Sequence, residues 1–163
     1  LLEYFAKELD ELHENRVRVH ILGDLDGLPA PQREACLRAM ERTRDNPGLK
    51  LNLALNYGGR AELVRAARQL AREVLSGALL PEQIDEQAIS DRLYTAGLPD
   101  VDLLIRTSGE QRLSNFLPFQ STYAEMMMVD ALWPDFTVEI YRQALQAFGK
   151  RERRFGGRPG EKP

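Results

Sequence analysis

Cysteine is nearly absent from this sequence, since Cys36 is the single one among 163 residues. One thiol cannot close an internal disulfide, and it cannot provide the several cysteine ligands of a structural zinc site. Long apolar runs are missing as well, because Glu125 and Asp130 interrupt the stretch 124–133, and a membrane span needs roughly 18 apolar residues. These absences exclude a disulfide scaffold, a cysteine zinc site and a membrane-spanning segment. The single thiol suits a reducing, intracellular setting.

The sequence also has no excess of basic charge. Its formal net charge is −3, from 22 basic and 25 acidic residues, which is unlike the basic surface of a nucleic-acid-binding domain. The two histidines, His13 and His20, have no serine or cysteine motif beside them that would indicate a nucleophile and its base. We therefore expect no nucleic-acid partner and no hydrolase of that type. The 43% hydrophobic content is that of a folded domain.

Helical and strand periodicities alternate along the chain. Apolar residues at helical spacing predict helices at residues 2–15, 31–45, 59–74, 84–93 and 140–148. Alternating or continuous apolar runs predict strands at residues 17–21, 51–55, 101–105 and 126–129. Strands separated by helices imply right-handed crossovers, so we predict an α/β fold with a mainly parallel sheet flanked by helices. Residues 1–150 would belong to one domain, followed by a charged arm at residues 151–163.

The most informative loop follows the third predicted strand, at residues 106–115. Ligands of parallel sheets bind at the carboxyl ends of strands, where this loop would lie. It carries Arg106, Arg112 and Ser114 around the flexible Gly109. Forked guanidinium donors and a hydroxyl group suit the oxygens of a diphosphate. The spacing of two arginines by itself also fits an ordinary solvated loop.

Two further features allow two interpretations each. Gly58 and Gly59 mark a turn from strand to helix, where exposed amides could hold an anion, although simple turn chemistry accounts for them too. Glu125 precedes the fourth predicted strand, where its carboxylate could bind Mg²⁺ or merely face solvent.

Several motifs, in this order, resemble the cis-prenyltransferases, the undecaprenyl diphosphate synthase family. The matching segments are residues 51–62, 102–116, 123–125, 132–136 and 151–157. The resemblance implies a three-layer α/β fold and a Mg²⁺-dependent condensation of isopentenyl diphosphate with an allylic diphosphate. Each new double bond would be cis, and the default product is undecaprenyl diphosphate.

The resemblance also implies roles for individual residues. Arg106, Arg112 and Ser114 match residues that hold isopentenyl diphosphate, with the backbone of Leu113 beside them. Glu125 matches a magnesium ligand. We expect the two arginines, the serine and the glutamate to converge on one metal-assisted diphosphate pocket.

The end of the chain resembles a further family feature. Arg154 and Gly156 match an Arg-x-Gly arm that contributes to substrate binding in the active site of the partner subunit. Members of the family are homodimers or heterodimers, and we expect a homodimer here. The resemblance also implies a cytoplasmic enzyme with a peripheral contact to the membrane surface for its lipid product.

One family motif has no counterpart in the sequence. The Asp-Gly-Asn-Gly-Arg loop, which holds the allylic diphosphate, is absent, so the family's catalytic Asp and Asn would lie before Leu1 and no catalytic residue is assigned here. We expect the leading strands of the sheet to be missing and these 163 residues alone to be inactive. Two other functions remain open, a non-catalytic accessory subunit of a cis-prenyltransferase complex and a phosphate-ligand-binding α/β module.

Overall fold

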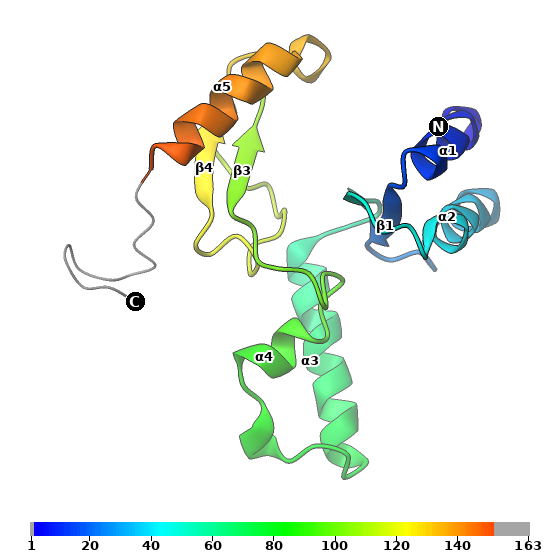
Figure 1. The fold of residues 1–163 in the computed structure, drawn as a ribbon. Coiled ribbons are helices and arrows are strands. Elements are labelled where there is room, and N and C mark those ends of the chain that lie inside the picture. Colours follow the sequence, from blue (N-terminus) through cyan, green and yellow to red (C-terminus); the bar gives the residue numbers. More distant parts are fainter. Residues whose placement is uncertain (1, 152–163) are drawn as a thin grey trace. The chain divides into compact units, whose positions relative to one another are not determined.

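The structure, a computed structural model, describes residues 2–151. The chain divides into two compact units, Leu1–Gly97 and Leu98–Pro163, and each unit is described by itself. Each unit contains one pair of parallel strands together with helices (Figure 1). The predicted α/β fold with parallel strand pairing is therefore confirmed, here as two two-stranded ladders. The grouping of residues 1–150 into one domain stays a prediction.

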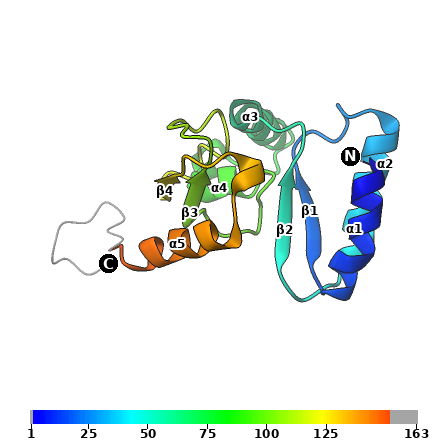
Figure 2. The ribbon, with the colours of Figure 1, turned by 90° about the horizontal axis from the view of Figure 1, so that it is seen from above.

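The first unit is built around two strands, β1 (Arg18–Leu22) and β2 (Lys50–Ala54), which pair in parallel along their whole lengths. The connection between them is α2 (Ala30–Thr43), as expected for a crossover between parallel strands. Helix α1 (Leu2–Glu14) packs beside α2, and both lie on the same face of the ladder (Figure 2).

The core of the first unit lies between this ladder and α2. Val19 and Ile21 alternate with exposed residues along β1, and they are buried against Cys36 and Ala39 of α2. Burial raises the pKa of the Cys36 thiol above its ordinary value. Thr43 is fully buried at the end of α2, where its hydroxyl donates to the carbonyl of Ala39 (2.8 Å) and accepts from the backbone N–H of Val19 (2.9 Å).

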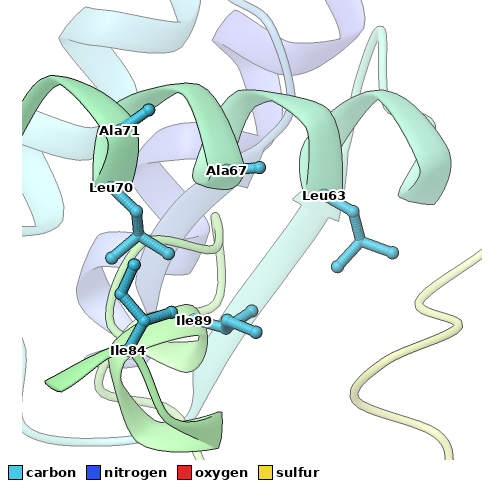
Figure 3. Close-up of a pocket in the computed structure, with 6 residues that line it drawn as sticks. All are labelled: Leu63, Ala67, Leu70, Ala71, Ile84 and Ile89. Carbon is cyan, nitrogen blue, oxygen red and sulfur yellow. The ribbon is translucent and has the colours of Figure 1, made fainter. Parts of the chain in front are cut away.

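The first unit continues with α3 (Gly59–Leu75), the short 3₁₀ helix η1 (Pro81–Gln83) and α4 (Glu86–Ser90). Helix α3 faces η1 and α4 across an aliphatic pocket of about 390 Å³ (Figure 3). Its lining residues are Leu63, Ala67, Leu70, Ala71, Ile84 and Ile89.

Helix α4 is shorter than the predicted helix at residues 84–93, and side chains at its two ends explain this. Asp85 caps its start by accepting a hydrogen bond from the backbone N–H of Ala88 (2.7 Å). At its other end the carbonyl of Ala88 accepts a hydrogen bond from the guanidinium of Arg92 (2.6 Å). The backbone N–H of Arg92 donates to the carbonyl of Ile89 (2.9 Å) instead of to that of Ala88, so the α-helical hydrogen-bond pattern ends there.

The second unit has the same parallel pairing, between β3 (Leu103–Arg106) and β4 (Glu125–Met128). After the 3₁₀ helix η2 (Trp133–Asp135), helix α5 (Val138–Gly149) runs beside this ladder (Figure 1). Thr137 caps α5 by accepting a hydrogen bond from the backbone N–H of Ile140.

Strand β4 begins one residue earlier than the predicted strand at residues 126–129. Glu125 therefore lies inside the strand rather than before it.

Candidate functional site

The candidate site is the loop after β3, at residues 106–115, and the segment that follows β4 holds this loop in place. The backbone N–H of Ser108 donates to the carbonyl of Ala131 (2.9 Å), and that of Gly109 donates to the carbonyl of Val129 (3.0 Å). Both Ser108 (φ 67°) and Gly109 (φ 64°) have left-handed backbone conformations. The loop is therefore a fixed turn at the carboxyl end of the ladder, where parallel sheets bind ligands.

Two arginines of this loop have different surroundings. Arg106 is the last residue of β3 and half-buried, and its buried Nε has no hydrogen-bond partner in the described part of the chain. Arg112 is exposed, and its guanidinium lies against the carboxylate of Glu110. A buried guanidinium nitrogen without an acceptor is costly, and an incoming anion would remove this cost.

The remaining loop residues add a hydroxyl group and a second backbone turn. Ser114 is exposed and has a left-handed conformation (φ 48°), as does its neighbour Asn115 (φ 64°). The carbonyl of Leu113 accepts from the backbone N–H of Phe116 (3.0 Å), which closes the turn. Strained backbone of this kind concentrates at binding and catalytic loops.

Glu125 occupies a different position, at the start of β4 opposite Leu103. Its side chain is 27% exposed, and its Oε2 accepts a hydrogen bond from Nη1 of Arg151 (2.5 Å). The same Nη1 also donates to the carbonyl of Met126 (3.3 Å). The carboxylate is therefore held by an arginine that follows α5.

The ladder separates Glu125 from Arg106, which corrects the expectation that the two converge. Arg106 lies opposite Met128, three register positions beyond Glu125, so about 10 Å of strand separates them at roughly 3.3 Å per residue. Since side chains alternate between the faces of a sheet, an odd separation also places the two on opposite faces. Within one chain, the register of this ladder therefore keeps Glu125 apart from Arg106.

The carboxylate that does lie beside the loop belongs to Asp130. A Cβ added to Gly109 would lie 3.4 Å from Oδ1 of Asp130. In the sequence, Asp130 stands between Val129 and Ala131, whose carbonyls hold the loop. Sequence reasoning treated Asp130 only as an interruption of an apolar run. Its position just after a predicted strand was the signal that could have found it.

The start of α3 supports the interpretation of Gly58 and Gly59 as turn residues. The side chain of Glu62, in the first turn of α3, is 1% exposed. Its two carboxylate oxygens accept from the phenol of Tyr57 (2.6 Å) and from the backbone N–H of Tyr94 (2.6 Å). The carboxylate of Glu62 therefore lies at the start of α3, where the alternative interpretation placed a bound anion. Sequence reasoning missed it because a Glu in a first turn is ordinarily exposed.

Carboxylate groups are the side chains of this chain that could hold Mg²⁺. Among the side chains that the structure describes, no group of three or more His, Cys, Asp or Glu residues could hold a metal ion. Mg²⁺ is, however, often held by one or two carboxylates together with substrate phosphates and water. Glu125 can provide one such carboxylate, so the donor chemistry fits a metal shared with a diphosphate.

Arg154 and Gly156, which were predicted to contribute to substrate binding, lie outside the described residues.

The fold and this loop define the class of protein. Parallel strands with a fixed, arginine-bearing loop at their carboxyl end are typical of α/β proteins that bind phosphorylated ligands. No helix in the described part of the chain has the length and apolar character needed to span a membrane.

Comparison with known proteins identifies the family. The family model described as "Putative undecaprenyl diphosphate synthase" matches residues 1–156. The chain therefore belongs to the undecaprenyl diphosphate synthase family of prenyltransferases, and the resemblance seen in the sequence is confirmed.

Individual relatives agree with this assignment. The chain is 51% identical over 160 residues to an isoprenyl transferase of Streptococcus thermophilus, covering 96% of this chain and 64% of the relative. It is 48% identical over 157 residues to an isoprenyl transferase of Clostridium perfringens, covering 96% of this chain and 62% of the relative. The crystal structure of lavandulyl diphosphate synthase from Lavandula x intermedia, in complex with dimethylallyl diphosphate, superposes with a TM-score of 0.91 at 35% identity, covering 95% and 67% of the two chains. The chain thus spans less than two thirds of the length of the two isoprenyl transferases.

Proposed function

We propose that the protein is a cis-prenyltransferase that condenses isopentenyl diphosphate with an allylic diphosphate to make a polyprenyl diphosphate, in the first place undecaprenyl diphosphate. The observation that carries the proposal is the fixed loop at residues 106–115, which presents two guanidinium groups at the carboxyl end of β3. Membership of the family and the names of the relatives support the same chemistry.

The loop would hold the diphosphate of isopentenyl diphosphate. Arg106 offers a buried Nε without a described partner, and Ser114 offers an exposed hydroxyl on a strained turn. Arg112 would exchange its contact with Glu110 for the diphosphate, which carries more negative charge than one carboxylate. The backbone of Leu113 would line the same turn. These groups bind and orient, and no residue of this chain is assigned a proton or a covalent bond.

Glu125 would contribute one oxygen to Mg²⁺. The metal, when bound, would neutralise the charge that develops on a departing diphosphate. Because the ladder places Glu125 away from the loop of its own chain, we propose that the two meet in a homodimer, in which Arg154 and Gly156 of the arm also contribute to substrate binding. We further propose a cytoplasmic location at the membrane surface, where the lipid product would be delivered.

The decisive experiment replaces Arg112 in the full-length protein. Arg112→Ala should reduce incorporation of radiolabelled isopentenyl diphosphate by about 100-fold or more, since a charge-assisted contact to the substrate is lost. Arg142→Ala, at an exposed arginine of α5, is the matched control and should retain wild-type turnover. Wild-type turnover in Arg112→Ala would contradict the proposal. Residues 1–163 by themselves should show no turnover in the same assay.

A further inference from the structure

Arg151 makes three contacts at the point where the chain leaves α5. Its backbone N–H donates to the carbonyl of Phe148 (2.9 Å), which ties it to the last turn of the helix. Its Nη1 donates to Oε2 of Glu125 (2.5 Å) and to the carbonyl of Met126 (3.3 Å). Arg151 therefore connects the end of α5 to the start of β4.

One of these contacts holds the Glu125 carboxylate, and the other two hold Arg151 itself in place. An isolated exposed ion pair contributes little, because solvent screens it and two long side chains must be ordered. Here the guanidinium is also bonded to a carbonyl, and the Arg151 and Glu125 side chains are only 39% and 27% exposed. The one hydrogen bond described for the carboxylate is accepted by Oε2. The arrangement thus holds one oxygen and leaves Oε1 as the one that can turn to a ligand.

We propose that Arg151 is a positioning residue that orients the Glu125 carboxylate for a divalent cation, an inference that rests on the proposed function. Carboxylate ligands of metals are themselves ordinarily held by hydrogen bonds from surrounding groups, and loss of such a group weakens metal binding by about 10- to 100-fold. Arg151 is also the first residue of the charged segment 151–163.

The test measures cation binding to the full-length protein, with and without isopentenyl diphosphate. Mn²⁺ is titrated as a paramagnetic probe, and binding is followed by the relaxation of water protons. Arg151→Met, which keeps the length of the side chain but removes its donors, should weaken Mn²⁺ binding by about 10- to 100-fold. Arg151→Lys should recover part of this loss, and Arg142→Met should bind like the wild type.

A kinetic split separates positioning from structural damage. In Arg151→Met the Mg²⁺ concentration for half-maximal activity should rise, while kcat at saturating Mg²⁺ stays close to the wild-type value. A fall in kcat that saturating Mg²⁺ does not restore, in both Arg151→Met and Arg151→Lys, would overturn the positioning role.

Glu125→Gln separates this inference from the proposed function. If Glu125→Gln loses Mn²⁺ binding while Arg151→Met binds as tightly as the wild type, or more tightly, the role of Arg151 is overturned and that of Glu125 stands. If Glu125→Gln binds Mn²⁺ like the wild type, or the wild type binds none, both roles are overturned.

Discussion

Buried hydroxyl and carboxylate groups of the two units differ in their hydrogen bonding. In the first unit the two most deeply buried polar side chains, Thr43 and Glu62, each have at least two hydrogen bonds. In the second unit the hydroxyl of Ser121 is buried, and its Oγ has no hydrogen-bond partner in the described part of the chain, as is the case for Nε of Arg106. The first unit also has buried side-chain atoms without a described partner, at Gln32, Asn52 and Arg65, so the contrast concerns its two most deeply buried polar groups.

Backbone strain shows the same contrast. Among the described residues, the second unit has four non-glycine residues with positive φ within ten positions of one another, namely Ser108, Ser114, Asn115 and Leu117. The first unit has two, Arg16 and Asn56, far apart in the sequence. Left-handed conformations cost about 1–2 kcal/mol for residues with a Cβ, so they persist where the surrounding structure imposes them. Positive-φ residues of the second unit are therefore concentrated in and just after the candidate diphosphate loop.

The largest effect on stability is expected at Glu62. Glu62→Ala leaves the Tyr57 phenol and the Tyr94 backbone N–H without this acceptor in a buried site, and should destabilise the full-length protein by about 3 kcal/mol. Urea denaturation measures the change. Glu34→Ala, at an exposed site with only a surface ion pair, should cost less than about 0.5 kcal/mol. Equal effects of the two changes would contradict a structural role for the buried carboxylate.

A matched pair of substitutions tests the contrast in buried hydroxyls directly. Thr43→Val keeps the shape of the side chain but removes two hydrogen bonds, so it should destabilise the protein by about 1–2 kcal/mol. Ser121→Ala removes a buried oxygen that has no described partner, so it should be neutral or stabilise by up to about 1 kcal/mol. Both are measured by urea denaturation. The comparison between the units fails if Ser121→Ala is the more destabilising of the two.

The smallest effect is expected on the pH dependence of stability, through the ion pair of Glu73 with Arg92 in the first unit. The hydrogen bonds from Arg92 hold the pKa of Glu73 below its ordinary value, although desolvation opposes them. A lowered folded-state pKa stabilises the protein above the unfolded pKa, and this contribution is lost as the pH falls through the folded pKa. Glu73→Gln should therefore lower the melting temperature at about pH 7 and differ less from the wild type at about pH 3. A constant difference across this range would contradict the assignment.

The sequence predicted the elements and the loop because both depend on local patterns. Alternation of Val17, Val19 and Ile21 identified the first strand, and the polar residues after Ile105 identified the arginine loop. The relation of Glu125 to Arg106 could not be predicted in this way. It depends on the register of two strands, and a shift by one residue would have moved Glu125 to the other face of the ladder.

Sequence by itself determined the alternation of helices and strands, the family, and the residue types of the candidate diphosphate loop. These follow from periodicity and motif, which are properties of neighbouring residues. Tertiary structure decided that Asp130, rather than Glu125, lies beside this loop, that Glu62 is buried, and that Arg151 holds Glu125. These contacts join residues 21 to 32 positions apart, and only the packing of the strands and helices brings such residues together.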